Sequence, residues 1–458
     1  MSRYILNTRK FLLDESSFKT LFLVLLAILL IGVVARKVLP TILEMSLVSL
    51  FMVWFFYLTQ KGPIDLAISK NIKKWLMLLF VFMLINLFPE IIHYFKEQGS
   101  YEGRLVSFVE RYLHLIMIGI VAFLGYKIRL SAVDVWKVLI LVSCFVLWVI
   151  LYEMIKLEFN PSAMMNHRFG LLASSYTIDF GIYSNTLFIV LLGALFWFKD
   201  FSKLWKFLLV MALIVDISGA VLSQSRTAWI GWPEAIIGWG SFYLYRLFST
   251  KENKKVIFFL GLILIFLIVI IMSPAKKIVE NRVNKAISNV MDYQNGNPGS
   301  SLGNRFVMYE VGINQIQRTP WLGIGVNNFA LFIQEDTKNL IKSKFGLTSS
   351  GYTYSHIHNQ FLMSFIIGGI FPFLSLLVIF GFLLWFFSQK IKTGVTERQK
   401  ALGIAGLVFT ITSLMTFLPE SPLMFKSQFI FFFVMASLLF LINDEESLNQ
   451  VKENNDKK

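Results

Sequence analysis

The sequence predicts an all-α polytopic membrane protein with about 12 transmembrane helices and one large loop between the ninth and the tenth. Hydrophobic residues make up 56% of its 458 residues and charged residues only 16%, against about 45–50% and about 25% in soluble domains. A bilayer core about 30 Å thick needs about 20 apolar residues per helix, and runs of that length recur along the chain. A soluble protein of this size could not bury so much apolar surface.

Each predicted span is an apolar run that ends where polar or basic residues begin. The runs cover residues 18–35, 38–59, 75–92, 105–126, 134–155, 180–198, 204–222, 229–248, 256–272, 360–387, 401–418 and 424–442. The chain therefore divides into a cytoplasmic N-terminal segment (1–19), helices 1–9 (20–272), the large loop (273–358), helices 10–12 (359–442) and a charged cytoplasmic tail (443–458). The first run is long and lacks a small-residue cleavage site, so we expect a retained helix.

The formal net charge of +15 is explained by membrane topology and not by nucleic-acid binding. Basic residues concentrate in every second connection, as Lys390, Lys392, Arg398 and Lys400 do after the tenth run. Cytoplasmic connections carry such an excess of Lys and Arg. With twelve spans this bias places both termini inside and the loop of residues 273–358 outside.

The large loop has its own predicted organisation. Residues 273–304 are polar and turn-rich, a helix is expected over 305–318, a turn over 319–329, and a second helix to about residue 344. Polar helices at a membrane face can form a wall or a lid. Gly323 and Gly325 are expected to allow the tight turn after Pro320 and Trp321.

Polar residues inside the spans are expected to be structural. Glu44, Glu153, Asp216 and Glu234 are costly in lipid, and their scatter favours hydrogen bonds between helices over a transport path. Cys144 is the single cysteine, so no disulfide can form within the chain.

The candidate chemistry lies on the predicted outer side, at Arg226, Arg305, His356 and His358. Each has a structural alternative: an arginine extending to the membrane surface, a salt bridge of Arg305 with Glu310, or a satisfied histidine hydrogen bond. Together, two arginines and a histidine suit the binding of a pyrophosphate and the handling of one proton.

No metal or cofactor is expected. The two histidines are two residues apart, and no other outer group of His, Cys, Asp or Glu completes a ligand set in the sequence. Motifs for nucleotide phosphates, dinucleotides, serine hydrolysis and zinc hydrolysis are absent from the sequence. These absences disfavour ATP hydrolysis, dinucleotide redox chemistry and zinc hydrolysis.

Three segments together resemble the O-antigen ligase and polymerase superfamily. They are SQSRTAW (223–229), GNRFVMYEVGINQIQRTPWLGIGVNNF (303–329) and SHIHNQFLMSFIIGGIFPFLSLL (355–377). The resemblance implies a GT-C-like membrane glycosyltransferase of the bacterial inner membrane, with its active site facing the periplasm. It implies a metal-independent, inverting transfer of a glycan from undecaprenyl pyrophosphate to the lipid A core or to another glycan.

Carried over by position, the resemblance assigns the catalytic roles to Arg226, Arg305 and His358. We place His356, Asn359 and Arg318 among the substrate-binding residues. The ligase pattern has His, then Asn, Ser or Gln, nine residues, and G-x-x-G; here Gly369 is present but Pro372 replaces the second glycine.

Four functions therefore stay open. An O-antigen ligase is favoured, and the alternatives are a polymerase that joins lipid-linked repeat units, a protein O-oligosaccharyltransferase, and a polysaccharide transporter or flippase. The expected partners are the lipid-linked glycan donor, the acceptor and membrane lipids. A structured outer loop argues against a transporter, which needs none.

Overall fold

The computed structural model describes residues 15–35, 40–60, 68–96, 103–170, 177–249, 275–348 and 356–456. Within these ranges every regular element is a helix. Nine helical segments of this described part are long and apolar enough to cross a membrane. The protein is therefore a polytopic, all-helical membrane protein.

The membrane-crossing segments follow the apolar runs of the sequence. They are α2 (Glu15–Val34), α4 (Lys70–Lys96), α5 (Gly103–Lys127), α6 (Ala132–Lys156), α8 (Thr177–Leu191) with the 3₁₀ helix η2 (Leu192–Asp200), α9 (Lys203–Leu222), α17 (Ile370–Thr393), α18 (Glu397–Phe417) and α19 (Lys426–Asp456). Two further apolar helices, α3 (Pro40–Gln60) and α11 (Trp232–Ser249), occupy the second and eighth predicted runs. The ninth predicted run, residues 256–272, lies outside the described residues.

The tenth predicted run is two helices and not one. The helix α16 (Gln360–Gly368) ends at Gly369, and α17 starts at the next residue. Gly369 has φ +77°, and a Cβ there would lie 2.1 Å from the carbonyl oxygen of Trp321. Both helices are apolar, so hydropathy alone could not reveal the break.

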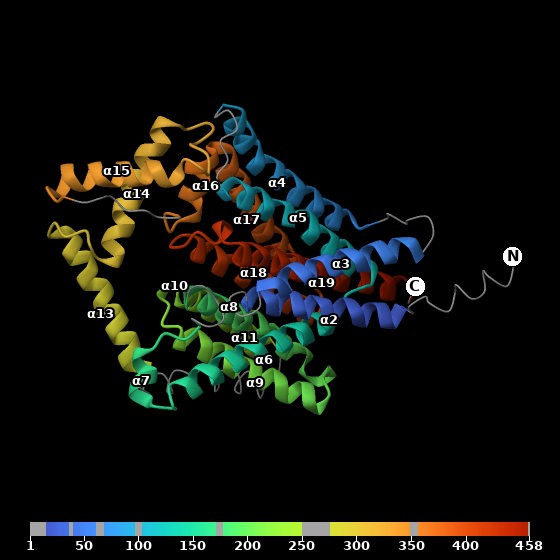
Figure 1. Cartoon of the computed structure of the whole chain (residues 1–458). Coiled ribbons are helices and arrows are strands. Elements are labelled where there is room, and N and C mark those ends of the chain that lie inside the picture. The colour runs from blue at the N-terminus through green and yellow to red at the C-terminus, as the bar shows by residue number, and fades with distance from the viewer. Residues whose placement is uncertain are drawn as a thin grey trace.

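Three helices form a layer at one end of the bundle, which we call the outer-helix face (Figure 1). They are α13 (Ala275–Gln294), α14 (Ser301–Arg318) and α15 (Phe329–Phe345). The helices predicted over 305–318 and to residue 344 are confirmed, but the turn-rich prediction for residues 273–304 is wrong over α13. Apolar residues recur at Val283, Ile287 and Met291 with helical spacing, and the turn residues are confined to 295–300.

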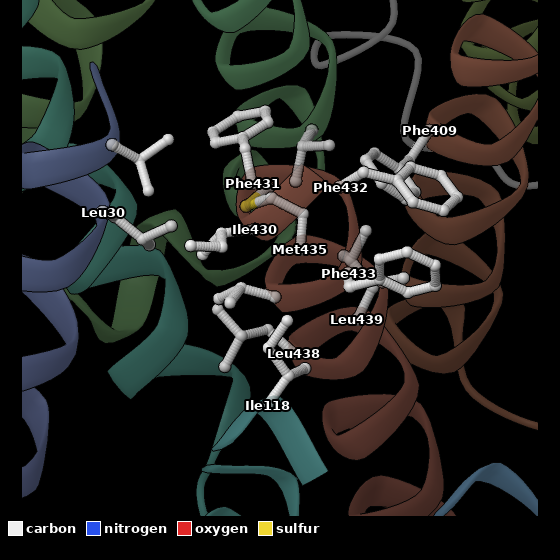
Figure 2. Close-up of a cluster of buried hydrophobic side chains, with 14 of the residues drawn as sticks. Leu30, Ile118, Phe409, Ile430, Phe431, Phe432, Phe433, Met435, Leu438 and Leu439 are labelled. Atoms are coloured by element: carbon white, nitrogen blue, oxygen red, sulfur yellow. The ribbon is translucent and has the colours of Figure 1, made fainter. Parts of the chain in front are cut away.

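The core is centred on α19, whose membrane-crossing part is wholly buried. Figure 2 shows Ile430, Phe432 and Leu439 of α19 among side chains of α2, α5 and α18, such as Leu30 and Phe409. A helix that is apolar on all sides belongs in the centre of a bundle. The start of α19 is consequently held in place from several directions.

Three of the four intramembrane carboxylates connect elements, as predicted. Lys426 at the start of α19 pairs with Glu44 of α3 at 2.5 Å and with Glu110 of α5 at 2.6 Å. Asp216 of α9 accepts a hydrogen bond from Ser143 of α6 at 2.7 Å. The third, Glu153, lies beside the candidate site.

Candidate functional site

The two motif histidines lie in the short segment before α16. His358 has φ +51°, a left-handed conformation that is uncommon for a residue with a side chain and that concentrates at functional sites. Asn359 follows as the N-cap of α16, and its side-chain oxygen accepts a hydrogen bond from the backbone N–H of Leu362 at 3.0 Å. The direction of α16 therefore determines where His358 lies.

Glu420, in the connection between α18 and α19, is the centre of the site. Its Oε2 lies 2.9 Å from His358 Nδ1, and its Oε1 accepts a hydrogen bond from Arg305 at 2.8 Å. The Thr227 hydroxyl lies 3.5 Å from the same Oε1. Glu420 is 4% exposed, so its charge is shielded from water and interacts strongly with these partners.

The helix α14 contributes two side chains to this cluster. Arg305 and Tyr309 are four residues apart and so project from the same face of the helix. Arg305 binds Glu420, and the Tyr309 hydroxyl donates a hydrogen bond to the backbone carbonyl of His358 at 2.7 Å. The outer-helix face is thus connected directly to the segment that carries the histidines.

His356 lies against His358 and is deeply buried. Its Nε2 is 3.2 Å from His358 Nδ1 and 3.9 Å from Glu420 Oε2, and its ring packs on Phe425 with centroids 4.9 Å apart. Burial, and next the neighbouring charge of His358, lower the pKa of His356 from 6.5 to about 4. His356 is therefore neutral at pH 7.

The pKa of Glu420 is lowered despite its burial. Burial alone would raise this pKa, but the hydrogen bond from His358 and the charges of His358 and Arg305 outweigh it. Glu420 is therefore a carboxylate at neutral pH. When His358 is neutral, a carboxylate at its Nδ1 favours the tautomer that carries the proton there, which leaves Nε2 as the proton acceptor.

Arg226 opens the short helix α10 (Arg226–Trp229), one residue before Thr227. Because the hydroxyl of Thr227 contacts Glu420, the segment that carries Arg226 lies beside Glu420. Gln224, two residues before Arg226, has φ +51°. The bend between α9 and α10 is therefore strained in the same way as the His358 segment. Ser225 caps α10 by accepting a hydrogen bond from Ala228 N.

The segment 167–170, which follows α7 (Pro161–Asn166), holds that bend from the other side. Glu153 at the end of α6 lies 3.0 Å from His167 Nε2 and accepts from the backbone N–H of Gly170 at 2.9 Å. Gln224 donates to the carbonyl of His167 at 3.0 Å. Glu153 thus has the role predicted for an intramembrane carboxylate, a contact between elements.

Arg318 is not brought to this cluster. It pairs with Asp336 of α15 at 3.0 Å and is 60% exposed in its side chain. Thirteen residues separate it from Arg305 along α14, which is about 20 Å of helix. The structure therefore unites Arg305, His356, His358 and Asn359, brings the Arg226 segment beside them, and leaves Arg318 apart.

Glu420 is not among the site residues that the sequence predicts. With His356 and His358 it offers three metal-ligating atoms within 4.8 Å of one another, so the inference that no third donor joins the histidines is wrong. One feature of the sequence could have indicated it: Glu420 is an acidic residue in the short connection between the last two predicted spans, on the same predicted side of the membrane as the loop of residues 273–358. Arg305 lies on the same carboxylate, and its positive charge disfavours a cation there.

The fold and the site define a polytopic membrane protein with an arginine–carboxylate–histidine cluster at one end of its helical bundle. Residues 211–377, which include Arg226, Arg305 and both motif histidines, match the Wzy_C family, described as O-antigen ligase. The match lies in the part of the chain whose motifs predicted the resemblance.

Two curated relatives share part of the chain. An uncharacterized protein of Haemophilus influenzae is 30% identical over 233 residues, 51% of this chain and 55% of the relative. The O-antigen ligase of Escherichia coli K12 is 25% identical over 239 residues, 50% of this chain and 54% of the relative. The chain thus aligns with about half the length of each.

Proposed function

We propose that the protein is an O-antigen ligase, a membrane glycosyltransferase that transfers a polysaccharide from undecaprenyl pyrophosphate to the lipid A core oligosaccharide. The single observation that carries this proposal is the cluster in which Glu420 joins Arg305 and His358, two residues of the matched segment 211–377. It supports a site that binds a pyrophosphate and accepts one proton. We also propose that this site faces the periplasm in the bacterial inner membrane.

His358 is the proposed general base. The acceptor hydroxyl attacks the anomeric carbon of the donor glycan, with inversion, while the bond from that carbon to the pyrophosphate oxygen breaks. The hydroxyl proton passes to His358 Nε2, and Glu420 stabilises the imidazolium that forms. Undecaprenyl pyrophosphate leaves.

Arg226 and Arg305 are proposed to bind the pyrophosphate. Negative charge grows on the leaving pyrophosphate in the transition state, so fixed guanidinium groups stabilise it more than the ground state. Such a site needs no metal ion, in line with the predicted metal-independent reaction. His356 and Asn359 line the acceptor side in this proposal, and Arg318 contacts a more distant part of the glycan.

A polymerase that joins lipid-linked repeat units is the second candidate. One observation favours it: Pro372 stands where the ligase pattern has its second glycine, and it packs against Gly368, where an added Cβ would lie 2.4 Å from Pro372 Cγ. The end of α16 is therefore shaped differently from that pattern. A protein O-oligosaccharyltransferase would use the same cluster with another acceptor.

The test is the lipopolysaccharide profile of a strain that lacks this protein, taken together with its undecaprenyl-linked glycans. A ligase predicts long glycan on the carrier and a bare core, restored by the wild-type chain. A core that carries a single repeat would identify a polymerase instead. A bare core with undecaprenyl-linked glycan retained on the cytoplasmic side would indicate a flippase, and normal lipopolysaccharide would also contradict the proposal.

A further inference from the structure

The turn of residues 319–326 holds the C-terminal end of α16, the helix that follows His358 and Asn359. The backbone N–H groups of Ile324 and Gly325 donate to the carbonyls of Ile366 and Ile367, in the last turn of α16, at 2.9 and 3.0 Å. In return, Ile370 N donates to Pro320 O at 3.0 Å. These bonds satisfy carbonyls that a helix end leaves without partners in the helix.

The contact is too close for side chains. A Cβ on Gly323 would lie 2.3 Å from the carbonyl oxygen of Ile367, and one on Gly369 would lie 2.1 Å from that of Trp321. Glycine is therefore needed here for the approach of two backbones, besides the positive φ of +65° that Gly323 adopts. This is more than the tight turn that the sequence predicts.

Two side chains of the membrane helix α4 hydrogen-bond to the 319–326 turn. The Glu90 carboxylate accepts a hydrogen bond from Val326 N, with its two oxygens at 3.1 and 3.2 Å. His93, three residues later on the same face, lies with Nε2 3.1 Å from Leu322 O. Glu90 is 3% exposed, so solvent competes little for this bond.

A chain of direct contacts therefore runs from α4 to the proposed base. It passes from Glu90 to the 319–326 turn, then to the end of α16, and along this nine-residue helix to Asn359 and His358. We propose that Glu90 is a positioning residue, which fixes α16 so that His358 meets Glu420. This inference rests on the proposed function, because it gives His358 the catalytic role.

The first test separates docking from backbone strain by means of two glycines. Gly323 and Gly346 have nearly the same φ, +65° and +66°, but an added Cβ meets nothing within 4 Å at Gly346. The assay uses carrier-linked glycan and core lipid extracted from the deletion strain as substrates. Gly323→Ala should lower kcat about 10- to 100-fold, the loss expected when the proposed base is displaced by about 1 Å. Gly346→Ala should change kcat less than about twofold; equal losses in both would overturn the proposal.

The second test asks whether Glu90 acts through His358. Glu90→Ala should lower kcat more than it raises KM, and Glu90→Gln, which retains an acceptor oxygen for Val326 N, should restore most of it. In a His358→Ala background, Glu90→Ala should cost less than about twofold more, because residues that act as a unit are non-additive. A fully additive loss would identify a merely structural role and overturn the proposal.

Amide hydrogen exchange tests the positioning without any activity. In purified full-length protein, Glu90→Ala should speed exchange at Ile324, Gly325 and Ile370. The control is Glu397→Ala, which removes the salt-bridge partner of Arg246 at 2.6 Å and should not speed exchange at these three amides. Unchanged exchange in Glu90→Ala would refute the contact chain. Faster exchange with no transfer by the wild-type protein would instead refute the proposed function alone.

Discussion

At the scale of single residues, the site consists of opposite charges around one buried carboxylate. Glu420 binds Arg305 at 2.8 Å and His358 at 2.9 Å. A buried pair is weak support for stability, because desolvation offsets the attraction. Its value here is geometric, since one carboxylate orients both the proposed base and a proposed pyrophosphate ligand.

Removing either partner of Glu420 should stop the reaction. Arg305→Ala and His358→Ala should each lower the transfer rate at least about 100-fold, because one removes leaving-group stabilisation and the other the proton acceptor. Initial rates with purified protein measure the loss. Both variants should still insert in the membrane in wild-type amounts, and transfer retained by both would contradict the site.

Acid should destabilise the protein through His356. Its pKa is about 4 when folded and 6.5 ordinarily, so between these pH values the unfolded chain binds the proton and the folded one does not. Stability is therefore lost as pH falls from 6.5 to 4, by roughly 3 kcal/mol. Because the pKa of Glu420 is lowered in the folded protein, its protonation removes further stability as the pH falls below 4.5, the usual pKa of a glutamate.

The check is thermal unfolding in detergent across this pH range. His356→Asn, which cannot titrate there, should show a shallower fall of Tm between pH 6.5 and 4 than the wild-type protein. An equal fall in both would show that His356 is not responsible.

At the scale of elements, α16 is the unit on which the site depends. It is nine residues long, begins at an Asn359 cap and ends on the 319–326 turn. So short a helix is not stable alone, and its two ends therefore have to be held by other parts of the chain. The tertiary contacts on both ends are what make His358 a fixed group.

The N-cap of α16 gives a prediction at this scale. Asn359→Ala removes the bond to Leu362 N and should cost about 1 kcal/mol of stability, together with a fall in kcat. The matched control is Thr396→Ala, which removes the cap at the end of α18 opposite to the connection that carries Glu420. Its stability loss should be similar, and its kcat unchanged; equal kcat in the two variants would contradict the role of the cap.

At the scale of the whole molecule, the bundle carries its polar chemistry at one end. The α13–α15 layer and the α18–α19 connection with Glu420 lie together, at the end opposite to the C-terminal part of α19 (Figure 1). The basic connection between α17 and α18 lies at the other end. The charge bias predicts that these two ends lie on opposite sides of the membrane.

Labelling should test that topology. In a Cys144→Ser background, Asn297→Cys should react with a membrane-impermeant maleimide in spheroplasts. Val395→Cys, at an 80% exposed position between α17 and α18, should react only after the membrane is opened. The reverse pattern would place the site in the cytoplasm and contradict the proposed periplasmic reaction.

The class of fold, most span positions and the two outer helices over residues 305–318 and to 344 could be predicted from the sequence, as could the motif residues Arg226, Arg305 and His358 as candidates for the site. These follow from local pattern, because hydropathy, helical spacing and motif order are properties of neighbouring residues. The sequence did not indicate the helix break at Gly369 or the part played by Glu420. These two features depend on tertiary contacts, because a close backbone approach and a buried carboxylate join segments that lie up to 193 positions apart, as Thr227 and Glu420 do.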